Sequence, residues 1–169
     1  MSSTSAVFKK LNLKDQSEIV VLNAPASFDT ELCLLHGVTV RKTLTSGTPI
    51  SFGLAFVMRQ AEVNALATSL AKMAEGDAVI WFAYPKGSSK RYTCEINRDT
   101  GWQALGSAGF EPVRMVAIDE DWTAVRFRRV DFIKTLTRDS EYAMSQAGKA
   151  RTATKQRSPR KRENPKKKR

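Results

Sequence analysis

The feature that most constrains the fold is an alternation of short, β-branched apolar runs with segments of helical character. Apolar runs at 18–25, 38–44, 50–57 and 77–85 end at turn residues and are typical of strands in a buried sheet. Helical patterns with start and stop residues separate several of them, at 27–37, 59–76 and 97–110. Strands alternating with helices predict an α/β fold with a mostly parallel sheet and helices on both faces, a three-layer sandwich.

Two further runs, 112–121 and 122–130, meet at a turn formed by Asp119, Glu120 and Asp121, which predicts an antiparallel hairpin strand at the C-terminal side of the sheet. Paired carboxylates can bind a metal or act in acid–base catalysis, but we read this group as a charged turn. The expected organisation is an N-terminal lead at 1–17, an α/β domain at 18–133, a linker or packing segment at 134–148 and a basic tail at 149–169.

The net charge of +11 is concentrated at the C-terminal end. Residues 149–169 contain eleven Lys and Arg and one Glu, whereas residues 1–148 are nearly neutral. A segment this polar cannot bury enough apolar surface to offset its ordering entropy, so we expect a disordered tail. Clustered cations release counterions from polyanions, and without aromatic residues the expected partner is DNA or RNA bound without sequence preference. The expected contact residues are Lys149, Arg151, Lys155, Arg157, Arg160, Lys161, Arg162, Lys166, Lys167, Lys168 and Arg169.

The remaining composition excludes several classes of protein. No apolar run is long enough to span a bilayer, and the first residues lack a signal-peptide pattern, so we expect a cytoplasmic protein, associated with the nucleoid or the ribosome if the tail binds nucleic acid. Cys33 and Cys94 belong to no Cys/His cluster, which predicts buried thiols and no metal site. His36, the single histidine, precedes Gly37 at an expected helix end and is not expected to be catalytic.

One turn has the composition of an anion site. Pro85 ends the most hydrophobic strand, and Lys86, Gly87, Ser88 and Ser89 follow directly. Ligands of open α/β sheets bind outside the carboxyl ends of the strands, where the strand order reverses. If the strands at 18–25 and 77–85 are neighbours, a crevice would bring together Asn23, Ser27, Lys86, Gly87, Ser88 and Ser89. The alternative is that the turn is simply solvated.

The chain resembles the Rossmann-like core of S-adenosylmethionine-dependent methyltransferases in shortened form, and more closely a bacterial family of small uncharacterised domains related to it. The resemblance covers about residues 8–130 and rests on VLNAP (21–25), Phe56, Val57, Ala61, Glu62, AYPKGSS (83–89) and DEDWTAVRFRR (119–129). It implies the fold but lends no settled activity.

Three determinants of the methyltransferase cofactor site are missing from this resemblance. The turn after the first strand, NAPASFD, has no glycine, the second strand ends VRKTL without an acid, and the third ends FVMRQ. We therefore expect no cofactor, S-adenosylmethionine included. The expected function is a non-enzymatic domain that associates with nucleic acid through its tail. The alternative is a small-ligand- or phosphate-binding protein, or a divergent methyltransferase-like enzyme, with its pocket above the first and fourth strands.

Overall fold

The structure, a computed structural model, describes residues 5–134 and 144–150 and contains a six-stranded sheet in the order β2-β1-β3-β4-β6-β5. The first four strands in the chain run parallel, whereas β6 is antiparallel to β4 and β5 is antiparallel to β6. The strands are β1 (Glu18–Leu22), β2 (Thr39–Arg41), β3 (Ile50–Phe56), β4 (Ala74–Pro85), β5 (Phe110–Ala117) and β6 (Trp122–Arg129). The predicted α/β fold, with a mostly parallel sheet and an antiparallel hairpin, is confirmed.

The central strands are buried on both faces, which explains why their sequences read as continuous apolar runs. In β4 all eight residues from Ala78 to Pro85 are buried, and in β3 only Ser51 is exposed. Side chains of successive strand residues point to opposite faces of the sheet. They therefore enter two separate cores, one on each face.

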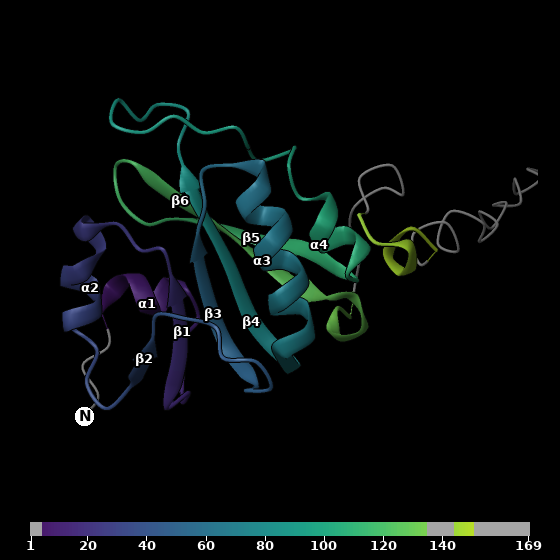
Figure 1. Cartoon of the computed structure of the whole chain (residues 1–169), viewed down its shortest axis with the longest axis horizontal. Helices are drawn as coiled ribbons and strands as arrows, with labels where there is room; N and C mark the ends of the chain where they lie inside the picture. The colour runs from purple at the N-terminus through teal and green to yellow at the C-terminus, as the bar shows by residue number, and fades with distance from the viewer. Residues whose placement is uncertain (1–4, 135–143, 151–169) are drawn as a thin grey trace, which may run out of the picture.

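The helices cover these two faces (Figure 1). On one face, α3 (Gln60–Met73) and α4 (Gln103–Ser107) pack with Leu22, Phe82 and Phe127 of the sheet. On the other, α1 (Ala6–Lys10) and η1 (Ala26–Phe28) pack with Phe52 and Trp81, and α2 (Asp29–Cys33) adds the partly buried Leu32. A last helical turn, η2 (Val130–Phe132), follows β6. The result is the three-layer arrangement predicted from the alternation of elements.

Two predicted helices are much shorter than their sequence patterns suggested. The segment 27–37 forms only η1 and α2, and the segment 97–110 is helical only in α4. The second difference has a local cause: the Asn97 side chain accepts hydrogen bonds from the N–H groups of Asp99 and Thr100, at 2.8 and 3.0 Å, and holds a turn where the helix was expected. Gly101, with φ +101°, then adopts a backbone conformation outside the helical region.

The prediction that the first and fourth strands are neighbours is wrong, because β3 lies between β1 and β4. Leu22 of β1 is in register with Ala55 of β3, and Ala55 is in turn in register with Phe82 of β4. The point where the strand order reverses is therefore between β1 and β3. Any ligand that follows the rule for open α/β sheets would bind above that pair.

Residues 144–150 return to the sheet at the amino-terminal end of β5. Glu111 is 2% exposed, and its carboxylate accepts hydrogen bonds from the N–H groups of Met144 and Ser145 and from the Ser145 hydroxyl, between 2.6 and 3.0 Å. Residues 146–150 are helical, and Lys149 is exposed there. The other predicted nucleic-acid contacts lie outside the described residues and stay sequence-based predictions: Arg151, Lys155, Arg157, Arg160, Lys161, Arg162, Lys166, Lys167, Lys168 and Arg169.

Across residues 5–134 and 144–150, no helix has both the length and the apolar character needed to cross a membrane. The cytoplasmic location itself stays a prediction.

Candidate functional site

The carboxyl ends of β1 and β3 form the switch point of the sheet, at the upper edge in Figure 1. Asn23 directly follows β1 and has φ +57°, one of two non-glycine residues in the described chain with positive φ. Glycine adopts this left-handed conformation most readily, and asparagine is among the few other residues that tolerate it. The backbone turn that the sequence appeared to lack, because it has no glycine, is thus supplied by Asn23.

The predicted anion-binding turn after β4 is occupied by contacts within the protein. The Lys86 amine donates to the backbone carbonyl of Asp119 at 2.6 Å, and the Lys86 N–H donates to the carbonyl of Asp121 at 2.7 Å. The Ser89 hydroxyl donates to the Asp121 carboxylate at 2.8 Å and accepts the N–H of Tyr92 at 3.2 Å. These groups therefore fasten the loop after β4 to the β5–β6 hairpin.

The six predicted ligand residues fall into two groups. Asn23 and Ser27 follow β1 and are exposed, whereas Lys86, Gly87, Ser88 and Ser89 follow β4, on the far side of β3. Gly87 and Ser88 are also exposed. The structure does not bring the two groups into one crevice, and a ligand role for either stays a prediction.

A cavity of about 360 Å³ does lie at the carboxyl edge, above the end of β3. Its lining comes from the residues that join β3 to α3, Met58 and Arg59, and from a stretch of the loop after β4, Thr93, Cys94 and Glu95. Backbone pairing holds these two segments together, because the N–H of Glu95 donates to the carbonyl of Met58 at 2.9 Å. None of the six predicted ligand residues lines this cavity.

Two carboxylates stabilise the start of α3 beside this cavity. Glu62 accepts the N–H groups of Met58 and Arg59 at 2.7 and 3.0 Å, and Glu95 accepts the N–H of Gln60 at 3.0 Å. The first N–H groups of a helix lack partners within the helix and carry its positive partial charge, so carboxylates are favoured there. The arrangement places two negative charges next to the cavity.

The same carboxylates affect the Cys94 thiol. Burial raises the pKa of Cys94 above its ordinary value, the backbone hydrogen bond with Ile96 opposes this, and the negative charges of Glu62 and Glu95 raise the pKa further. A raised pKa keeps the thiol protonated near neutrality, which is opposite to the activation of a nucleophilic cysteine. The surroundings of Cys94 therefore do not activate its thiol, and the residue forms part of the cavity wall.

Little in the sequence indicates this site. Glu62 lies three residues after Arg59 at an expected helix start, a spacing that could have indicated helix capping. Glu95 lies in a loop, and no pattern connects it to Gln60, thirty-five positions earlier. Both cysteines were predicted to be buried, but Cys33 is exposed and Cys94 is partly exposed. Among the described residues, no cluster of three or more potential metal ligands is present.

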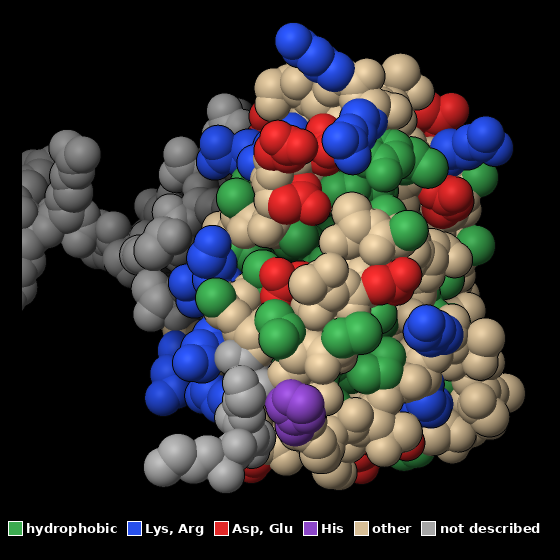
Figure 2. All heavy atoms as spheres, turned by 90° about the vertical axis from the view of Figure 1, so that its left-hand side faces the viewer, with side chains coloured by type: hydrophobic (Ala, Val, Ile, Leu, Met, Phe, Trp, Pro, Cys, Tyr) green, Lys and Arg blue, Asp and Glu red, His purple; other side chains and the backbone are tan. Residues whose placement is uncertain are grey.

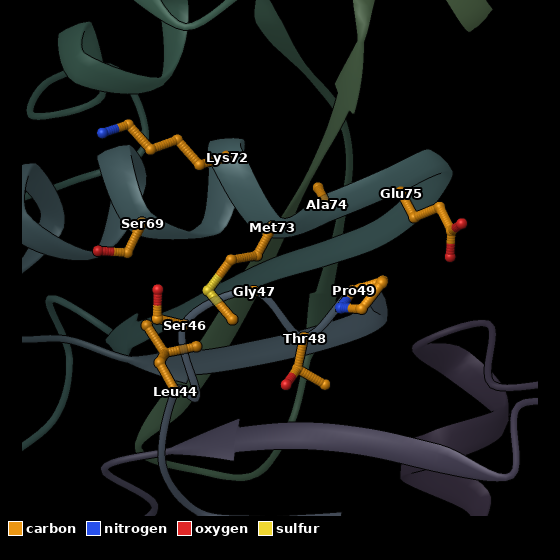
Figure 3. A pocket seen from close by; sticks show the side chains of 10 residues that line it. All are labelled: Leu44, Ser46, Gly47, Thr48, Pro49, Ser69, Lys72, Met73, Ala74 and Glu75. Atoms are coloured by element: carbon orange, nitrogen blue, oxygen red, sulfur yellow. The ribbon is translucent and has the colours of Figure 1, made fainter.

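A second, larger cavity of about 570 Å³ lies at the opposite end of the sheet (Figure 3). It is bounded by the link between β2 and β3 and by the last turn of α3. In Figure 3 the Leu44 and Met73 side chains meet across it, while the Ser46, Thr48 and Ser69 hydroxyls surround them. This cavity is remote from the switch point and lacks the paired carboxylates of the first.

The face that carries α2 shows mixed charge (Figure 2). Carboxylates lie in its upper and middle parts, hydrophobic side chains are exposed between them, and most Lys and Arg side chains lie toward the rim. Among the described residues, this view shows no uniformly basic surface of the kind that binds nucleic acid.

Comparisons with solved structures agree with this topology. A methyltransferase from Aquifex aeolicus that depends on S-adenosylmethionine superposes with a TM-score of 0.52 over 76% of this chain and 90% of its own, at 14% identity. The mostly parallel six-stranded sheet with its antiparallel strand pair is a Rossmann-like fold that matches the fold of this methyltransferase. The glycopeptide N-methyltransferase MtfA, complexed with S-adenosylmethionine, matches over 75% of this chain and 93% of its own, with a TM-score of 0.50 and 9% identity. No family model matches the chain. No curated protein matches it either.

These structures correct two expectations. The main prediction, a non-enzymatic domain that associates with nucleic acid, is wrong, because the methyltransferase fold supports the alternative better. The prediction of no cofactor is also overturned, because the similar fold of MtfA holds S-adenosylmethionine. The resemblance to methyltransferases is supported, whereas the closer resemblance to a small uncharacterised family stays untested.

Proposed function

We propose that this chain is a divergent methyltransferase-like protein that binds S-adenosylmethionine above the carboxyl end of β3, beside the switch point. The observation that carries the proposal is the pair of carboxylates, Glu62 and Glu95, beside the cavity at the end of β3. S-adenosylmethionine carries a sulfonium and an ammonium group against one carboxylate. A site with two nearby negative charges suits such a cation better than it suits a phosphate.

The residues around the end of β3 and in the turn after β1 fit the charged part of this cofactor. Asn23 supplies the left-handed turn after β1 that lets a ligand approach the backbone, although its own side chain is present where a glycine would leave space. Glu95 and Glu62 would face the positive groups, and Arg59, which is exposed at the cavity, would pair with the methionine carboxylate. When bound, the cofactor would supply an activated methyl group.

The ribose of the cofactor has a weaker match. An acid at the end of the second strand usually binds the ribose hydroxyls of nucleotide cofactors in this class of fold. Here β2 ends at Arg41, and the Arg41 guanidinium forms an ion pair of 2.8 Å with Glu18. The ribose would therefore have to be held by other groups, which is the main divergence of this site.

Titration calorimetry with S-adenosylmethionine and S-adenosylhomocysteine tests the proposal. The two ligands share adenosine and the amino acid but differ in the methyl group and the positive charge on sulfur. We expect both to bind and the charged ligand to bind more tightly. Glu95→Gln keeps an acceptor for the N–H of Gln60. It should reduce the ratio of the affinity for S-adenosylmethionine to that for S-adenosylhomocysteine about threefold to tenfold, as expected for the loss of one nearby charge.

Glu75→Gln is the matched control, because Glu75 is an exposed carboxylate at the opposite end of the sheet. It should leave both affinities unchanged. Binding of inorganic phosphate with no binding of either adenosyl ligand would reject the proposal. Equal effects of the two substitutions would reject the assignment of Glu95.

A further inference from the structure

The outer part of β5 is an unpaired sheet edge. β5 ends the strand order, and no strand in the described part of the chain pairs with its outer side. Residues 144–150 are anchored to Glu111 at its beginning, but Val113, Arg114 and Met115 are all exposed, Val113 and Met115 at 40% and 39%. An edge with free backbone donors and acceptors can pair with another extended chain.

The two faces of this edge differ in chemistry. From Arg114 onward β5 is in regular register with β6: Arg114 is opposite Arg126, and Met115 is opposite Val125. Because side chains alternate along strands, Met115 lies on the face of Val125, whereas Arg114 lies on the face of Arg126. An added strand would therefore meet an apolar side chain on one face and positive charge on the other.

On the positive face, one partly buried arginine lacks an anionic partner among the described residues. Arg128 uses the carboxylate of Asp77, through an Nε–Oδ1 hydrogen bond of 2.7 Å and a second contact from its Nη2. Arg126 is partly buried, and its Nε atom is shielded from solvent and has no acceptor among the described residues. Burial lowers the pKa of Arg126, and the charge of Arg128 lowers it further. Within the described part of the chain, Asp77 pairs with Arg128, and neither Arg114 nor Arg126 forms an ion pair.

We propose that residues 113–117 of β5, together with Arg126, form a docking edge for an extended segment of a partner protein in which acidic and apolar residues alternate. The backbone of that segment would continue the sheet beside β5. Its acidic side chains would pair with the arginines, and its apolar side chains would cover Met115. Arginine binds carboxylates in a bidentate manner, which gives the acidic positions their selectivity.

Fluorescence anisotropy of the full chain with labelled peptides tests this proposal. The probe is a nine-residue peptide of alternating Glu and Val, and the comparison peptide alternates Lys and Val. We expect the acidic peptide to bind and the basic one to fail. Arg114→Glu, at an exposed position, should weaken the acidic peptide about tenfold and allow the basic peptide to bind.

Lys42→Glu, which makes the same charge change just after β2 at the opposite edge of the sheet, is the matched control and should leave binding intact. Two further versions of the acidic peptide would carry N-methyl groups, one on its odd-numbered and one on its even-numbered residues. At least one of these two peptides should fail to bind, because the methyl groups remove backbone donors. Equal binding of the acidic and basic peptides would overturn the proposal. Unchanged binding of both methylated peptides would overturn it too, as would self-association of the chain through this edge in sedimentation experiments.

Discussion

The indole nitrogen of Trp81, in the central strand β4, donates a hydrogen bond of 2.8 Å to the backbone carbonyl of Leu11, seventy residues earlier. Both residues are fully buried. Leu11 is the C-cap of the N-terminal helix α1, so this bond joins the end of the first element of the described chain to the middle of the sheet. It indicates that the segment before β1 is part of the folded domain.

Trp81→Phe should lower the free energy of unfolding by about 2–4 kcal/mol, because it leaves the Leu11 carbonyl unpaired and also removes buried volume. Urea denaturation would measure the loss. Trp122→Phe is the control: Trp122 is also buried, but its indole nitrogen has no acceptor among the described residues. An equal loss for the two variants would show that the hydrogen bond contributes nothing.

Tyr84 should make stability depend on alkaline pH. Burial raises the pKa of Tyr84 above its ordinary value of 10.0, and the charge of Cys94 raises it further. Above pH 10 the unfolded chain would lose this proton before the folded protein does, so stability should fall as the pH rises. Urea midpoints measured from pH 9 upward should show a smaller decline in Tyr84→Phe than in the unmodified chain.

Glu111→Gln should loosen residues 144–150. A neutral amide loses the charge of the carboxylate, whose Oε1 accepts three donors, and its NH2 group replaces Oε2, which accepts the Met144 N–H; Glu111 is also buried. We expect a loss of about 1–3 kcal/mol in the free energy of unfolding. Hydrogen exchange should accelerate at Met144 and Ser145 while the amides of β3 and β4 stay protected. Unchanged exchange at these two amides would contradict the anchoring role.

Gly101→Ala should be more harmful than Gly47→Ala. Both glycines have positive φ, +101° and +78°, so both substitutions strain the backbone. A Cβ at Gly101 would also overlap the Ile96 side chain, whereas nothing lies within 4 Å of one at Gly47. We expect a difference of about 1–3 kcal/mol in thermal or urea denaturation. Similar losses would mean that Ile96 can move aside.

The fold could be predicted from the sequence because its strands are buried on both faces, and continuous apolar runs as short as Ala78–Pro85 are typical of such strands. Strand order was not predicted correctly. The sequence of β3 does not indicate on which side of β1 this strand lies in the sheet. The expected crevice therefore combined residues that β3 separates. The cavity lining was also missed, because the contact of Glu95 with Gln60 depends on how a seventeen-residue loop, 86–102, folds back.

The link between β2 and β3 is a place where the chain could be lengthened. Parallel strands are usually joined by a crossover helix, but here residues 42–49 make the connection without one and border the larger cavity. The space around Gly47 is open, and the segment contributes only Leu44 to the adjacent core. A graft of a dozen or more residues, even a whole helix, could therefore be accepted at this connection with the strand register intact.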